Sequence, residues 1–283
     1  MILALAQPAL AQMRAADGLA ALDAGDAVAA REIWVALAGR GDVLAQHNLA
    51  VLMLTGQGGA RDRDGALIWF EAAALQDYLP AQLALAGLAQ ERGDLDVARR
   101  WYHAAAKGGD AGAQFALAKL LERAGDAEGA QPWYRAAAEQ GVVGAQFALA
   151  AALAEQGEHA EAADWFEAAS HAGDPRAMHN LAVALAQGFG RDQDDAAARA
   201  LYLQAAQAGY APAMRNLALM QARGRGGAQS FRFALTWALN ADALDEPGAG
   251  DLVAALREVM SEQAIAEAET LAEGCLHGAV DCA

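Results

Sequence analysis

Cysteine is almost absent from this sequence of 283 residues: Cys275 and Cys282 are the only two, and both lie in the last nine positions. With only His277 nearby, they supply too few ligands for a closed zinc site. Serine occurs at three positions, none of them in Ser-x-x-Lys or Gly-x-Ser-x-Gly, and the chain contains no His-Glu-x-x-His or nucleotide-binding glycine motif. No segment approaches the ~20 uncharged apolar residues that span a bilayer. We therefore predict no metal site, no cofactor, no catalytic residues and no membrane insertion.

Basic residues are also scarce, 20 against 36 acidic residues, which gives a formal charge of −16. This charge would repel the phosphate backbone of nucleic acids and an anionic lipid surface, so neither is an expected partner. The remaining composition, with 55% hydrophobic and 20% charged residues, is typical of a folded globular or solenoid chain.

The first residues, MILALAQPALAQ, form an apolar run that ends in Ala9-Leu10-Ala11, the small-x-small pattern at which signal peptidase cuts. The positively charged start of a secretory leader is missing, so we interpret residues 1–11 as the truncated remnant of a signal peptide. This interpretation predicts a periplasmic or secreted bacterial protein. An ordinary apolar helix start is the alternative, and it would leave the protein in the cytoplasm.

One short unit recurs along the chain. Residues 101–121, WYHAAAKGGDAGAQFALAKLL, and residues 133–153, WYRAAAEQGVVGAQFALAAAL, are near copies 32 positions apart. An alanine followed by glutamine or methionine marks six copies, at spacings of 36, 32, 32, 32 and 36: Ala45, Ala81, Ala113, Ala145, Ala177 and Ala213. A pair of large apolar residues begins twelve positions before each of these anchor alanines. In four copies the pair starts with a tryptophan to which we assign a structural role: Trp69, Trp101, Trp133 and Trp165.

The residue types in each copy predict a helix, a turn and a second helix. Glycine stands four positions before the anchor in five copies, where it can take the left-handed conformation that ends a helix, and Asp77 stands there in the other copy. Small and large residues recur at helical spacing, and proline begins the second helix in three copies, where no backbone N–H is wasted. One helix pair cannot bury its apolar face alone, so the copies must stack. This pattern predicts an all-α solenoid.

Two kinds of link join successive copies. Three links are short and turn at a glycine, whereas three are longer and glycine-rich. The copies followed by a long link carry Asn48, Asn180 or Asn216 three positions after the anchor, and the other copies carry alanine there. Because an amide both donates and accepts hydrogen bonds, we hypothesise that each asparagine holds its link. His47 and His179, which interchange with apolar residues between copies, are interpreted as packing residues.

The segments AQHNLAVLMLTGQGGARDRDGALIWFEAAALQ and AMHNLAVALAQGFGRDQDDAAARALYLQAAQAG resemble the Sel-1-like repeat family, a relative of the tetratricopeptide repeats. The resemblance spans about residues 19–242, although copies two to four lack the long link and are closer to tetratricopeptide repeats. It implies a right-handed α-solenoid of about six and a half repeats over residues 12–242. Capping helices and the cysteine-containing tail would follow over residues 243–283.

Family members hold protein partners in the concave surface of the superhelix. The resemblance therefore implies a non-catalytic adaptor of the bacterial cell envelope that binds a partner protein or peptide. Some exported, cysteine-rich relatives are linked to β-lactam binding or hydrolysis, but this chain lacks their cysteine pair in each repeat. A cell-wall-active enzyme of that type and a purely structural spacer are the alternative functions.

Binding residues are expected where the repeat does not dictate the residue type. Such a stripe lies one position before, two after and six after the tryptophan of copies three to five, and it provides these candidate groove residues: Arg100, His103, Lys107, Arg135, Glu139, Asp164, Glu167 and His171. Residues 92–123 hold six bases against four acids, so copy three is locally basic. A solvated polar face with intramolecular ion pairs is the alternative interpretation of this stripe.

We predict that Cys275 and Cys282 form a local disulfide, because an oxidising compartment oxidises closely spaced cysteine pairs. Protein purified from its native host should then lack residues 1–11 and have an intact mass two hydrogen atoms below that of the dithiol form. Free thiols together with a retained N-terminus would instead place the protein in the cytoplasm.

Overall fold

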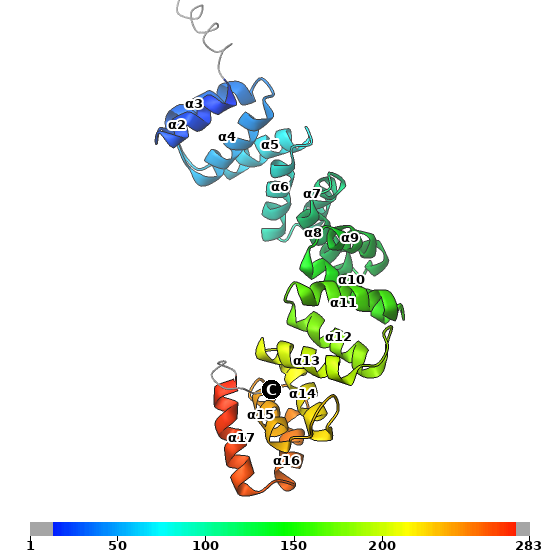
Figure 1. The fold of residues 1–283 in the computed structure, drawn as a ribbon. Coiled ribbons are helices and arrows are strands. Elements are labelled where there is room, and N and C mark those ends of the chain that lie inside the picture. The colour runs from blue at the N-terminus through cyan, green and yellow to red at the C-terminus, as the bar shows by residue number, and fades with distance from the viewer. Residues whose placement is uncertain (1–13, 276–283) are drawn as a thin grey trace, which may run out of the picture. The chain divides into compact units, whose positions relative to one another are not determined.

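The computed structural model describes residues 14–275, and every regular element in this part of the chain is a helix (Figure 1). The predicted all-α class is confirmed. Packing divides the chain into two compact units, Met1–Trp133 and Tyr134–Ala283, each a stack in which a helix contacts mainly its neighbours in sequence. The predicted leader remnant and Cys282 lie outside the described residues, so the structure does not bear on the leader or the disulfide.

The first unit begins with one extra helix and the helix pair of copy one, and continues with the helices of copies two and three. Its helices are α2 (Ala15–Asp23), α3 (Ala27–Ala38), α4 (Val43–Thr55), α5 (Arg63–Ala74), α6 (Leu79–Glu91), α7 (Leu95–Lys107) and α8 (Ala111–Arg123). The boundary between the units falls inside α9 (Ala127–Glu139), one residue after Pro132. Because α9 begins at Ala127, Pro132 is an interior residue that removes one helical hydrogen bond, at a cost of about 3 kcal/mol.

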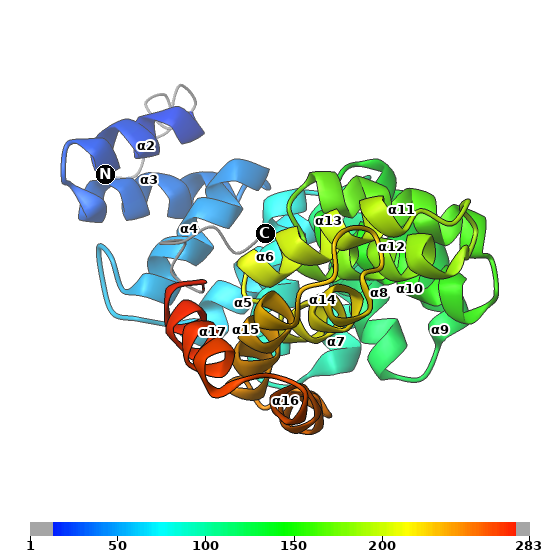
Figure 2. The ribbon, with the colours of Figure 1, turned by 60° about the horizontal axis from the view of Figure 1, so that its bottom comes forward.

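The second unit continues the same alternation and ends in two further helices. Its helices after α9 are α10 (Val143–Glu155), α11 (His159–His171), α12 (Pro175–Gln187), α13 (Asp195–Gln207), α14 (Ala211–Arg223), α15 (Phe231–Asp242), α16 (Ala249–Glu258) and α17 (Glu262–Cys275). Figure 2 shows α15 lying against both α16 and α17, and the packing of the residues agrees. The end of the stack is therefore covered by helices that do not continue the repeat.

The anchor alanines are completely buried, and their small side chains permit neighbouring helices to pack closely. All six have no exposed surface. The glutamine that follows the anchor in four copies donates its side-chain N–H to the carbonyl oxygen eight positions earlier, at 3.2–3.4 Å, and so pairs a carbonyl at the end of the preceding helix. The Ala-Gln pair thus combines close packing with the capping of a helix C-terminus.

In the pair of large apolar residues that precedes each anchor, the core residue is mostly the second member and not the tryptophan at the first position. In five copies the second member is buried, with 1–5% of its surface exposed: Trp34, Phe70, Tyr134, Phe166 and Tyr202. Copy three is the exception, because Trp101 is buried at 6% exposure and Tyr102 is only half-buried. The other predicted structural tryptophans, Trp69, Trp133 and Trp165, are half-buried. The physical reason is that the second position shares a helix face with the buried alanines four before and three and four after it.

The turn inside each copy has a left-handed backbone at the predicted position. The glycines there have φ of 84–91°, and Asp77, which replaces glycine in copy two, has φ of 58°. Because a side chain is strained in this conformation, glycine recurs at the turn for a backbone reason rather than for packing.

The long links need glycine for a second reason, which is close backbone contact. A Cβ atom on Gly58, Gly190 or Gly226 would lie 2.1–2.2 Å from backbone atoms of the residue 31 positions earlier, at the start of the preceding helix pair. The glycines of the short links, such as Gly157, have a similar left-handed φ but no atom within 4 Å of such a Cβ. A long link therefore lies flat on the beginning of its own helix pair.

Arginine side chains, rather than the predicted asparagines, make the hydrogen bonds that hold the long links. Arg61 donates to the Leu54 carbonyl at 2.7 Å, and Arg199 donates to the Ala228 carbonyl at 3.1 Å. Arg225 donates to the Ala186 carbonyl at 2.8 Å. An arginine carries five donors on a long stem, so it can join a link to a carbonyl that a short amide does not reach.

Gly190→Ala should destabilise the protein more than Gly157→Ala. Both glycines have a left-handed φ, which costs an alanine about 1–2 kcal/mol. Only the methyl group at position 190 would also collide with the His159 backbone. Urea unfolding followed by circular dichroism should show the larger loss for Gly190→Ala, and equal losses would contradict the close packing of the link.

Candidate functional site

The described residues contain no helix of the length and apolarity required to cross a bilayer. Within the same part of the chain, no three His, Cys, Asp or Glu side chains gather where they could hold a metal ion. Hollows between helices occur in both units, and polar side chains contribute to their lining.

The hollow of the first unit is built on α7. Arg100, His103 and Lys107 are spaced by three and four positions, so they share one face of this helix. All three line a hollow of about 620 Å³, which Asp77, Leu79 and Gln82 complete from the α5–α6 turn and α6. The structure thus brings together the three candidate residues that the sequence placed in copy three.

Two cations of this hollow are uncompensated. Within the described chain, Arg100 and Lys107 make no ion pair, and both are exposed. Arg100 lies over the Trp101 ring at 5.1 Å, and His103 packs edge-on against Trp133 at 5.7 Å between ring centres. Aromatic contacts orient these side chains without neutralising a charge.

Two other arginines of copy three are paired with acidic residues. Arg92 contacts Asp94 at 2.8 Å, and Arg99 contacts Asp96 at 2.9 Å. These exposed pairs each contribute at most about 1 kcal/mol. These two arginines are therefore less available to a partner than Arg100 and Lys107.

The candidate residues of copies four and five are engaged within the second unit instead. Arg135 forms an ion pair with Glu161, and its guanidinium holds the pKa of the Glu161 carboxyl below its ordinary value. Asp164 and Glu167 both accept hydrogen bonds from Arg191, at 2.8 and 2.6 Å. In this half of the stripe, the alternative interpretation of intramolecular ion pairs describes the structure.

Three further observations complete the account of the predicted stripe. Glu139 and His171 are exposed on the surface of the second unit. Arg191, which lies in the long link after α12, was not identified from the sequence, because a position in a glycine-rich turn gives no indication of ion-pair partners on another helix. Its contacts depend on the link lying back over α11, a tertiary feature.

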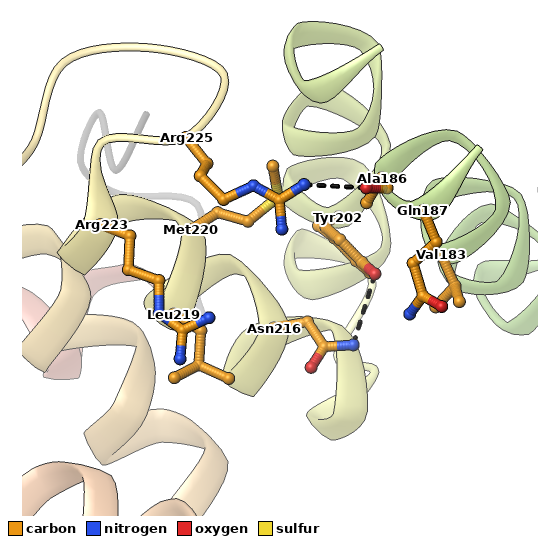
Figure 3. A pocket seen from close by; sticks show the side chains of 9 residues that line it. All are labelled: Val183, Ala186, Gln187, Tyr202, Asn216, Leu219, Met220, Arg223 and Arg225. Atoms are coloured by element: carbon orange, nitrogen blue, oxygen red, sulfur yellow. Dashed lines mark hydrogen bonds between the residues drawn. The ribbon is translucent and has the colours of Figure 1, made fainter. Parts of the chain in front are cut away.

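The hollow of the second unit has a volume of about 200 Å³ (Figure 3). Side chains from α12, α13, α14 and the link after α14 line it: Val183, Ala186, Gln187, Tyr202, Asn216, Leu219, Met220, Arg223 and Arg225. Val183, Leu219 and Met220 provide an apolar floor, and the amides and guanidinium groups lie around it. Sequence reasoning missed this hollow apart from Asn216.

The half-buried ring of His179 joins polar groups next to this hollow. The Nδ1 atom of His179 lies 3.1 Å from the Asn180 Oδ1 atom, and Asn216 Nδ2 lies 3.0 Å from His179 Nε2 and 3.4 Å from the Tyr202 hydroxyl. The amide of Asn216 donates to Nε2, so the ring proton resides on Nδ1, from which it is donated to Asn180. In the described structure no hydrogen bond joins Asn48, Asn180 or Asn216 to a long link. This finding corrects the predicted role of the asparagines.

Both histidines at this repeat position pack against aromatic rings, as their exchange with apolar residues predicts. His179 contacts Tyr202 and Tyr210 at 5.5 and 5.4 Å between ring centres, and His47 contacts Phe70 and Tyr78 at 5.4 and 5.2 Å. Burial lowers the pKa of His179, although its bond to Asn180 acts in the opposite direction. Burial also raises the pKa of Tyr202 to about 12.

Stacked helix pairs of this length with left-handed turns define a helical repeat protein of the tetratricopeptide-like class. Five segments match the Sel1 repeat model, at residues 43–78, 80–110, 111–142, 175–210 and 211–241. Because these segments include more than half of the chain, the chain belongs to the Sel1 repeat family. This fold is typical of protein–protein interaction scaffolds, and such proteins are generally non-catalytic.

The solved structures that resemble the chain include two Sel1-type repeat proteins. The crystal structure of c5321, a protective antigen of uropathogenic Escherichia coli strains with an SLR fold, is 27% identical, with a TM-score of 0.68 over 89% of this chain. A Sel1 repeat protein from Oxalobacter formigenes is 31% identical, with a TM-score of 0.55 over 80% of this chain and 70% of its own. The chain spans 56% of the length of the c5321 structure. No curated protein matches the chain.

We predict that His179 titrates below its ordinary pKa of 6.5, because burial disfavours the imidazolium. The unfolded chain then binds the proton first as the pH falls. The stability that depends on neutral His179 is complete above pH ~6.5 and is lost as the pH falls through the folded-state pKa. An NMR titration of the ring should show this midpoint, and Asn180→Ala should lower it further. A midpoint at or above 6.5 would contradict the burial of a neutral ring.

Proposed function

We propose that this protein is a non-catalytic adaptor of the bacterial cell envelope that binds an extended segment of a partner protein in the hollow on α7. The observation that carries the proposal is the presence of two uncompensated cations, Arg100 and Lys107, on one side of that hollow. A partner with acidic side chains would neutralise them, and this match of charges also steers association.

The spacing of the two cations specifies the partner further. Arg100 and Lys107 are seven residues apart on α7, which corresponds to a rise of about 10 Å along the helix. A peptide in the extended polyproline II conformation advances ~3.1 Å per residue with three residues per turn, so acidic residues three positions apart lie on one side of it and would reach both cations. Asp77 lines the same hollow and would accept a basic residue of the partner. The preferred segment therefore carries both charges in a defined order.

The cell-envelope part of the proposal rests on the leader-like pattern of residues 1–11. An adaptor of this kind would act on other exported proteins, which are the partners available in that compartment. Its specificity would come from the charged hollow, since the repeat positions that build the core are shared by all copies.

The double variant Arg100→Glu and Lys107→Glu should weaken binding of the predicted peptide at least about tenfold, which corresponds to 1.4 kcal/mol. The probe is a labelled twelve-residue peptide with two glutamates three positions apart, compared with the same composition in which the glutamates are adjacent. Fluorescence anisotropy at two salt concentrations should show weaker binding and a smaller salt dependence for the variant.

The matched control is Lys119→Glu with Arg123→Glu, which makes the same change of charge on exposed residues of α8 outside the hollow. The control should bind the peptide nearly as well as the unaltered chain, and both variants should keep the helical melting curve. Equal losses in both variants would reduce the effect to overall charge and overturn the proposed site. Capture of envelope proteins followed by mass spectrometry would then identify the natural partner.

A further inference from the structure

A stretch of sequence rich in arginine contributes to the hollow of the second unit. Residues 196–241 contain five arginines and no aspartate or glutamate, in a chain whose formal charge is −16. This stretch includes α14 and the long link that follows it, and two of its arginines, Arg223 and Arg225, line the hollow. The excess of arginine in this stretch favours an anion over a cation.

The two arginines of the hollow differ in what they bind. The guanidinium of Arg225 is already bound within the protein, because it forms an ion pair with Asp195 and donates to the Ala186 carbonyl at 2.8 Å. Arg223 is exposed and, within the described residues, makes no ion pair or hydrogen bond through its side chain. Arg225 thus fixes the wall of the hollow, and Arg223 keeps its guanidinium donors available to a ligand.

The remaining groups of the hollow are an acceptor and an apolar floor. Asn216 uses its amide nitrogen toward His179 and Tyr202, which leaves its Oδ1 atom as an acceptor. Val183, Leu219 and Met220 are apolar, and Figure 3 shows them around the same opening as Asn216 and Arg223. A volume of about 200 Å³ is below the ~300–1,000 Å³ of sites for drug-sized ligands, so the hollow has room for about one amino-acid residue.

We propose that this hollow binds the carboxyl-terminal residue of a partner polypeptide that ends in an aliphatic side chain. Arg223 pairs with the terminal carboxylate, the Asn216 Oδ1 atom accepts the backbone N–H, and the side chain rests on Val183, Leu219 and Met220. A terminal residue presents a carboxylate, an N–H and an apolar side chain within one residue. An internal glutamate supplies the carboxylate without the apolar group, so it matches the hollow less well.

This site is separate from the one in the proposed function, since it uses other residues in the other unit. Its ligand also differs, because a chain end replaces an extended charged segment. An experiment that disproves binding at one of the two sites therefore has no bearing on the other proposal.

The test uses the full chain, labelled with ¹⁵N, and three short peptides. The first is N-acetyl-Gly-Ala-Leu with a free carboxylate, the second is the same peptide as a C-terminal amide, and the third is N-acetyl-Gly-Glu-Ala amide with only an internal carboxylate. NMR titrations should show that amidation weakens binding at least about tenfold, as expected for loss of a charge-assisted pair. The side-chain amide signals of Asn216 and Gln187 should shift with the first peptide.

Arg223→Gln supplies the decisive comparison. If Arg223 contacts the terminal carboxylate, amidation should cost this variant less than about threefold, because the two changes remove the same interaction. Arg232→Gln, an exposed arginine of α15 outside the hollow, should keep the full effect of amidation. An unchanged spectrum outside the hollow would show that both variants are folded.

Three results would overturn the proposal. They are an absence of spectral change with the first peptide, an equal effect of amidation in the unaltered chain and in Arg223→Gln, and tighter binding of the internal glutamate peptide than of the free-carboxylate peptide. The last result would assign the hollow to acidic side chains instead of chain ends.

Discussion

The close approach of helices across fully buried alanines is the constraint on which the rest of each unit depends. Each anchor alanine has no exposed surface, so there is no room for a larger side chain at that contact. The neighbouring helices must then fill the remaining space with one aromatic residue per copy, such as Phe70 or Tyr202. Since both features recur with every copy, the helices of a unit stack in one repeated manner.

The long links turn this regular packing into distinct surfaces. Their glycines lie against the start of the preceding helix pair, and in two links the residue immediately before this glycine lines a hollow between helices. Phe189 in one link stacks on His159 at 5.2 Å, whereas Arg225, the residue 36 positions later, pairs with Asp195. The same backbone arrangement therefore carries an apolar contact in one copy and a charged one in the next. Variation at such positions changes the surface without disturbing the core.

Charge pairing decides which polar residues are available for a partner. The chain has an excess of acidic residues, and in the second unit Arg135 and Arg191 are consumed by Glu161, Asp164 and Glu167. Arg100, Lys107 and Arg223 lack such partners in the described structure, and each of them lines a hollow between helices. Because exposed ion pairs are weak, these unpaired cations are more informative about binding than the paired ones are about stability.

The sequence by itself determined the helices, the left-handed turns, the buried anchors and the family, because each of these follows from residue types at fixed local spacing. It also placed Arg100, His103 and Lys107 on one helix face. The tertiary structure alone decided that Tyr134 rather than Trp133 enters the core, since adjacent helix positions differ by about 100° and only the neighbouring copy selects between them. It likewise decided that Asn216 bonds to His179 and that Arg191 pairs with two carboxylates of α11. Long polar side chains select partners that folding brings near from distant positions, and local periodicity contains no information about those positions.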